Sequence, residues 1–255
     1  MRSMPRAAAL FGLLGMATVV LAACGGGDDN EPASTGTPAA AATVESRYEV
    51  EALLMAASLQ QEDWPEGYEY ALNEQRFTTN EESAAEESDY PGGPTQEDLD
   101  GFGRLLGYRV SYSVQSVDEL LGGTTDISVT TNAHQDSRGA SDYLEFERRR
   151  FSDPKLVEAL YEQAGGEVGD VRQADITPMT VAEVGDQRYA FELRLTVHQT
   201  DLDRDLEIIV QSVYIQRDRL LGYVDLFAIG APSAPGPKVD DLARALDERM
   251  KDALE

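Results

Sequence analysis

The sequence contains two histidines, His134 and His198, as candidates for a general base near neutral pH. A hydrolytic triad needs such a base in contact with a nucleophile and an orienting acid. His134 follows an alternating segment and His198 lies on the polar side of another, so we interpret both as surface residues. The sequence has no Gly-x-Ser-x-Gly, His-Glu-x-x-His or Gly-x-x-x-x-Gly-Lys motif. We therefore name no catalytic residue and predict that the chain is not an enzyme.

Carboxylates offer two further kinds of chemistry. The 47 acidic residues make chance pairs inevitable, so an envelope hydrolase using paired carboxylates is the alternative function, with no pair singled out. Asp201, Asp203 and Asp205 alternate as the ligands of a calcium loop do. Leu206 stands where such a loop needs glycine, and Ser212 where it needs a bidentate glutamate. We interpret the segment as a solvated turn and predict no metal and no cofactor.

The single cysteine, Cys24, follows an N-terminal segment typical of a signal peptide. Arg2 and Arg6 precede the uncharged, apolar stretch 7–23. This stretch ends in Leu21-Ala22-Ala23-Cys24, which resembles the lipobox of bacterial lipoproteins. The resemblance implies cleavage before Cys24 and acylation of its thiol, which would hold the protein on the outer face of the cell membrane or outer membrane. The alternatives are an uncleaved membrane anchor at the lower limit of spanning length, and ordinary signal cleavage that leaves a free thiol.

Composition divides the chain into three parts. We assign 1–23 to the lipoprotein signal peptide, 24–43 to the lipidated cysteine and a flexible linker, and 44–255 to a single extracytoplasmic domain. The formal net charge of -26 disfavours a nucleic-acid partner, because such a surface repels phosphate backbones. The one basic run, Arg148-Arg149-Arg150, is interpreted as a solvated helix face.

Hydrophobic periodicity predicts an α+β domain with an antiparallel β-sheet covered by helices. Helices are expected over 44–61, over 137–151, after Asp153-Pro154 until Gly165-Gly166, and over 239–254. Strands are expected over 68–72, 108–114, 127–133, 188–198, 206–215 and 220–229. Residues 79–95, which include the acidic run 79–90, are interpreted as an exposed loop, and 101–106 as the end of a short helix.

Two sets of apolar residues receive a specific prediction. In the first helix, Tyr48, Ala52, Met55 and Leu59 have the spacing of one face. Nine tyrosines could line a ligand pocket, although packing in the core or against the sheet is the simpler interpretation. They are Tyr68, Tyr70, Tyr108, Tyr112, Tyr143, Tyr161, Tyr189, Tyr214 and Tyr223.

Several segments, in this order, resemble small bacterial lipoproteins of the PsbP-like fold group. They are Trp64-Pro65-Glu66-Gly67-Tyr68, the stretch 136–143 at a helix start, the arginine-flanked hairpin 216–222 and the final amphipathic helix. The resemblance covers roughly 50–255 and implies a binding or assembly module without shared catalytic residues. We therefore predict a membrane-tethered module of the bacterial envelope that binds a small amphipathic ligand or an envelope protein.

Overall fold

The structure, a computed structural model, describes residues 45–64, 70–88, 92–114, 124–164, 170–199, 204–229 and 238–255. The predictions for the signal peptide, Cys24 and the linker lie outside these residues, as do those for Gly165-Gly166, for Asp201 and Asp203, and for Tyr68. The predicted α+β class is confirmed, because a seven-stranded antiparallel sheet is packed between helices.

The sheet has the strand order β1-β2-β3-β7-β6-β5-β4. Its strands are β1 (Tyr70–Thr78), β2 (Arg104–Val114), β3 (Thr124–His134), β4 (Asp170–Pro178), β5 (Gln187–Gln199), β6 (Arg204–Arg217) and β7 (Leu220–Ile229). Strands that follow one another in the chain pair antiparallel in both halves, and β7 returns to the middle of the sheet to pair with β3. The two halves are therefore joined by a pairing that is distant in sequence.

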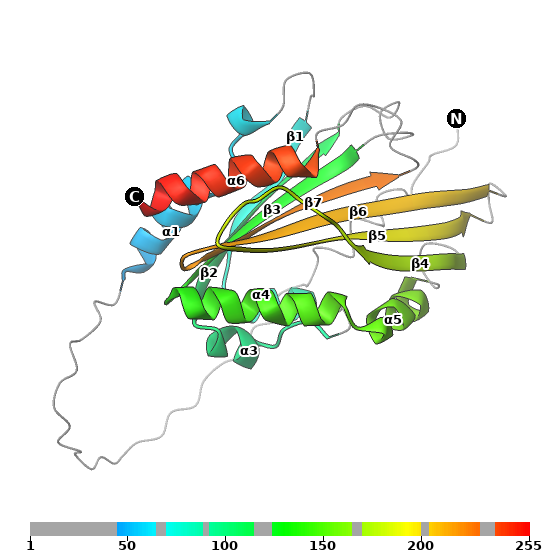
Figure 1. Cartoon of the computed structure of the whole chain (residues 1–255), viewed down its shortest axis with the longest axis horizontal. Helices are drawn as coiled ribbons and strands as arrows, with labels where there is room; N and C mark the ends of the chain where they lie inside the picture. Colours follow the sequence, from blue (N-terminus) through cyan, green and yellow to red (C-terminus); the bar gives the residue numbers. More distant parts are fainter. Residues whose placement is uncertain are drawn as a thin grey trace, which may run out of the picture.

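Two helices cover one face of the sheet. These are α1 (Arg47–Ala57) and α6 (Val239–Leu254), which lie side by side across it (Figure 1). Leu242, Leu246 and Met250 of α6 are fully buried in the larger hydrophobic cluster. Gly222 of β7 permits the close approach, because a Cβ there would lie 2.8 Å from the Met250 sulfur. The described members of this cluster run from Val50 to Met250, so it joins the first helix of the domain to the last.

The other face carries α2 (Asn80–Glu87), α3 (Gln96–Gly101), α4 (Ser137–Phe151) and α5 (Pro154–Ala164). α4 lies against β3, β7, β6 and β5, and α5 follows it toward β4 at the edge of the sheet (Figure 1). The Asp136 carboxylate caps α4 by accepting the Gly139 N–H at 2.9 Å. Asp153 likewise accepts the Lys155 N–H at 2.9 Å at the start of α5, as its Asp-Pro sequence predicts.

The face predicted for α1 is wrong. Val50, Leu54 and Ala57 are buried, whereas Tyr48 is 79% exposed and Met55 is 43% exposed. Of the predicted face only Leu59 is buried, and it lies beyond the end of the helix. The segment carries two apolar stripes with helical spacing, and packing against α6 buries the one with branched aliphatic side chains. The helix also begins later than predicted, because the Ser46 hydroxyl and the Glu49 carboxylate cap each other's backbone N–H groups.

Three further elements differ from the sequence predictions. Residues 80–87 form α2 rather than an exposed loop, because Thr79 and Glu82 make a capping box that starts a helix. Residues 101–106 include the end of α3 and the start of β2, joined by a turn in which Gly103 has a φ of 61°. β4 was not predicted, since its polar sequence reflects an edge position with one paired neighbour. A short 3₁₀ helix, η3 (Gln61–Asp63), follows α1.

Candidate functional site

The last turn of α4 distributes three consecutive arginines into different surroundings. The Arg149 side chain is 73% exposed, in agreement with the predicted solvated helix face. Arg150 is only 7% exposed and contacts Glu87 and Glu147, so the interpretation of the whole run as a solvated face is wrong. Arg148 reaches β5, where its Nη2 donates to the Arg188 carbonyl at 3.3 Å. Adjacent residues on a helix point about 100° apart, so one arginine run serves both flanks of α4.

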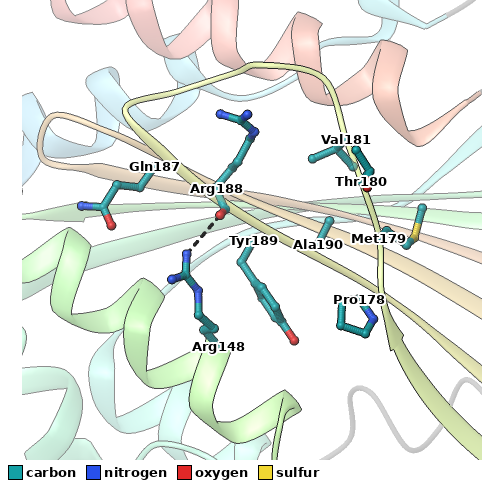
Figure 2. A pocket seen from close by; sticks show the side chains of 9 residues that line it. All are labelled: Arg148, Pro178, Met179, Thr180, Val181, Gln187, Arg188, Tyr189 and Ala190. Carbon is teal, nitrogen blue, oxygen red and sulfur yellow. Dashed lines mark hydrogen bonds between the residues drawn. The ribbon is translucent and has the colours of Figure 1, made fainter.

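A cavity of about 480 Å³ lies beside Arg148, at the edge of the sheet. Figure 2 shows Arg148 extending from α4 toward β5, with Tyr189 beside it, while the Arg188 side chain extends from β5 in the other direction. The cavity is lined by Arg148, Pro178, Met179, Thr180, Val181, Gln187, Arg188, Tyr189 and Ala190. Its volume is in the range of small-molecule sites.

The segment between β4 and β5 forms the outer wall of this cavity. The pairing of the two strands ends at Pro178 and Phe191, and residues 179–186 then arch past the start of β5 (Figure 2). The Met179 N–H donates to the Ala190 carbonyl at 2.9 Å, and the Asp186 N–H to the Gln216 carbonyl at 2.7 Å. In between, the Ala182 N–H lies 3.4 Å from the Asp240 carboxylate of α6. The arch is thus attached at both ends and near its middle. These attachments hold it away from the start of β5, and the cavity lies between them.

The cavity combines apolar walls with positive charge. Pro178, Met179, Val181 and Ala190 supply aliphatic surface. The Arg148 guanidinium lies 5.8 Å from the centroid of the Tyr189 ring, a cation–π distance. Arg188 is one-third exposed, and its nearest carboxylate, Glu183, is 3.8 Å away and almost fully exposed. No carboxylate occurs among the described lining residues. Such a site suits a small ligand with an anionic group and an apolar portion.

A second group of charged side chains is buried beneath α4. Arg150 donates from Nη1 to Glu87 at 3.0 Å and to Glu147 at 3.4 Å. Burial raises the pKa of Glu147 to about 8, although Arg150 opposes this shift. Burial likewise raises the pKa of Asp225 to about 6, against the hydrogen bond that it accepts from Ser212 at 2.6 Å. Neither carboxyl is among the described residues that line the cavity beside Arg148.

The structure does not bring the two histidines together. His134 is fully buried at the end of β3, so its interpretation as a surface residue is wrong. Its Nδ1 lies 3.0 Å from the Phe102 carbonyl, and burial lowers its pKa to about 4. His198, on β5, has a side chain that is 16% exposed and lies 2.8 Å from Asp205. Since β7 and β6 separate the two strands, the histidines belong to different surroundings.

The remaining sequence candidates also have clear positions. Asp205, the described member of the Asp201-Asp203-Asp205 set, contacts His198 and, at 3.4 Å, Arg172. Among the described residues, no group of three or more histidine, cysteine or acidic side chains could hold a metal ion. Buried tyrosines belong to the core or pack against the sheet, and Tyr189 lines the cavity. The buried ones are Tyr108, Tyr112, Tyr143 and Tyr214.

Sequence reasoning missed most of the cavity. Arg188 belongs to a segment predicted only as a strand, and Met179 and Val181 lie in a segment with no periodic pattern. A usable signal was the Pro178 that ends β4, because proline interrupts strand pairing and frees the chain to arch away.

No protein-family model matches this sequence, and no curated protein matches it significantly. The resemblance to the PsbP-like group therefore stays a prediction. Among solved structures, the chain is similar to the extracellular domain of PknH from Mycobacterium tuberculosis, with a TM-score of 0.42 and 9% identity. The similarity covers 79% of this chain and 94% of that domain. Within the described residues, none of the helices has the length and apolar character needed to cross a membrane.

Proposed function

We propose that this protein is a lipid-anchored, extracytoplasmic binding module of the bacterial envelope, and that it holds a small amphipathic anion in the cavity beside Arg148. The observation that carries the proposal is the contrast between the cavity and the rest of the molecule. The chain has 47 acidic and 21 basic residues, yet two arginines and no carboxylate occur among the described lining residues of the cavity. An anion would therefore meet positive charge there, on a chain that is otherwise strongly acidic.

The position of Arg148 supports a role in holding the anionic group of a ligand. Arg148 is held against the Tyr189 ring and the Arg188 carbonyl, so it is oriented before a ligand arrives. Its contact with Glu145, at 3.5 Å between half-exposed side chains, is of the weak surface kind. A carboxylate or phosphate on a ligand can displace Glu145 from Arg148. The apolar portion of the same ligand would then contact Met179 and Val181 beneath the arch.

The anchoring part of the proposal depends on Cys24. The charged Arg2 and Arg6, the apolar stretch 7–23 and the lone cysteine agree with a lipoprotein signal. We expect Cys24→Ala to abolish incorporation of radiolabelled palmitate into the protein, while the parent chain is labelled. Equal labelling of the two would contradict acylation at this cysteine.

We prefer binding over hydrolysis because the carboxyls with raised pKa values lie outside the cavity beside Arg148. Glu147 and Asp225, the carboxyls whose pKa values burial raises, are absent from the lining of the cavity. A hydrolase using paired carboxylates needs its acid and base beside the substrate.

Native mass spectrometry of residues 44–255, purified from a bacterial periplasm, tests the binding proposal. We expect an extra mass that disappears on denaturation and belongs to an organic anion. Arg148→Gln is expected to lower the occupied fraction by at least about fivefold, because it removes the charge that faces the ligand.

Arg138→Gln is the matched control, since Arg138 is also on α4 but is 88% exposed in its first turn. It is expected to retain the extra mass. A bare mass for the parent fragment would count against a tightly held ligand, and an extra mass that Arg148→Gln leaves unchanged would place the ligand elsewhere.

A further inference from the structure

A second cavity, of about 490 Å³, lies on the other flank of the α4 C-terminus. α4, the start of α5 and the α3–β2 turn contribute to it. It is lined by Gly92, Phe102, Phe146, Arg149, Arg150, Asp153, Lys155, Leu156 and Ala159. It shares no lining residue with the cavity beside Arg148. The two cavities are therefore separate candidates for ligand binding.

Two half-buried phenylalanines form the aromatic wall of this cavity. Phe102 stacks on the buried Tyr143, with ring centroids 5.3 Å apart and planes 9° from parallel. The centroid of Phe146 lies 5.6 Å from that of Phe102. Both rings pack against a second, smaller hydrophobic cluster, whose buried members include Leu99, Leu144 and Leu221. They are thus fixed in place while part of their surface remains open to the cavity, where a flat ring could stack.

Three cations border the same space. The Arg150 side chain is held in the protein by Glu87 and Glu147. Arg149 is 73% exposed, and its ion pair with Glu145 is long, at 3.6 Å. Among the described residues, no carboxylate forms an ion pair with the exposed Lys155 ammonium.

The carboxylate in the lining, Asp153, is oriented by a hydrogen bond to the Lys155 backbone N–H that begins α5. With Arg150 paired to Glu87 and Glu147, the two cations Arg149 and Lys155 still outnumber this one carboxylate in the lining.

We propose that this hollow between α4 and α5 is a second binding site, which takes an aromatic anion. Its ring would stack against Phe102 and Phe146, and its negative group would lie between Arg149 and Lys155. Leu156 and Ala159 supply the aliphatic floor. An aryl phosphate or an aryl carboxylate matches this lining. Its ring suits the two phenylalanines, and its negative group suits the cations.

Calorimetric titration of the full chain in a non-ionic detergent tests this site, with 1-naphthyl phosphate as the probe and detergent buffer as the blank. We expect saturable binding to one site per chain. Inorganic phosphate is expected to bind at least about tenfold more weakly, because it cannot stack on the aromatic wall.

Charge-reversed variants separate the two cavities. Lys155→Glu and Arg149→Glu are each expected to weaken naphthyl phosphate binding by about tenfold, and both side chains are exposed enough for the fold to tolerate them. Arg148→Gln, which changes the other cavity, is expected to alter this affinity by less than about twofold.

Three results would overturn the proposal: no saturable heat, equal affinity for inorganic phosphate, or a loss of affinity in Arg148→Gln without one in Lys155→Glu. The last result would place the probe beside Arg148 and would leave the first site supported. Retained binding in Arg148→Gln together with a bare mass in native spectrometry would support this site and count against the first.

Discussion

The two faces of the sheet are built from different chemistry. The face under α1 and α6 is closed by aliphatic and aromatic side chains, with Val213, Leu220 and Val224 fully buried. The face under α2 and α4 instead buries Arg104, Asn132 and Glu147 beside its smaller aromatic cluster. Both candidate cavities border α4, and neither is lined by a residue of α6. The apolar face thus closes the larger core, and it also supplies the aliphatic wall of the first cavity through Met179, Val181 and Ala190. The polar face supplies α4, whose last turn carries charged side chains of both cavities.

The buried charges of the polar face fix the position of α4, for a physical reason. Apolar burial is non-directional and tolerates small shifts, whereas buried charges need specific partners at specific distances. Arg150, for example, is fixed between Glu87 of α2 and Glu147 of α4. These contacts set the position of the helix whose last turn carries Arg148 and Arg149. The following predictions test this division in order of decreasing effect.

The largest effect is expected for Leu246→Ala on the apolar face. Leu246 is fully buried, and one of its methyl groups would lie 3.0 Å from a Cβ on Gly222, so its removal leaves a cavity. We expect the free energy of unfolding to fall by about 2–5 kcal/mol, measured by urea denaturation. Tyr48→Ala on exposed α1 surface is the control, expected to change it by less than about 0.5 kcal/mol. A comparable loss for both variants would contradict the assigned helix faces.

A slightly smaller effect is expected for Arg104→Met on the polar face. The buried guanidinium makes five hydrogen bonds, all to uncharged acceptors, through which it joins β1, α2 and β3. Burial lowers the pKa of this arginine, yet methionine would leave those acceptors unpaired. We expect a loss of about 2–4 kcal/mol. Hydrogen exchange should show the loss first in α2; unchanged stability would mean that water replaces these bonds without penalty.

The smallest stability effect is a pH dependence that comes from Glu147. Its folded pKa of about 8 lies above its ordinary value of 4.5, so the folded chain keeps a proton that the unfolded chain releases. Stability should therefore fall as the pH rises from 4.5 to about 8. Below pH 6.5 the buried His134, with its lowered pKa of about 4, acts in the opposite direction. The effect of Glu147 should thus be clearest above pH 6.5.

Urea denaturation at pH 6.5 and at pH 8 measures this slope. We expect a decrease of about 1–2 kcal/mol for the parent chain and a flat response for Glu147→Gln, which has no proton to release. Asp142→Asn, on the exposed surface of α4, is the control and should keep the slope. If Glu147→Gln keeps it too, another group is responsible.

The sequence predicted the elements with strong periodicity and clear caps. The helices 137–151 and 239–254 and the strand 220–229 have the predicted bounds, because their apolar spacing and flanking residues agree. The acidic helix α2 was missed, although its Thr79-x-x-Glu82 signature was present, because composition was given more weight than capping. The burial of His134 could not be read from its position at a strand end, since α3, α4 and the turn at Phe102 cover it only in the folded chain.

The candidate sites were harder to predict for a similar reason. Each cavity gathers residues from segments far apart in sequence, such as Arg148 and Met179, or Phe102 and Lys155. The arginine run was noticed, but the side chains that border each flank of α4 come from distant segments, such as Arg188 of β5 and Glu87 of α2. Spacing along the chain carries no information on those neighbours.

The most direct test of the central claim uses the methionines of residues 44–255, which are Met55, Met179 and Met250. Met179 lines the cavity beside Arg148, Met55 is exposed on α1, and Met250 is fully buried under α6. With ¹³C-labelled methionine methyl groups, we would titrate the fragment with hexyl phosphate, a small amphipathic anion. We predict a saturable shift of the Met179 signal alone, which is lost in Arg148→Gln. An unmoved Met179 signal, or equal shifts of Met179 and Met55, would contradict a binding site under the arch.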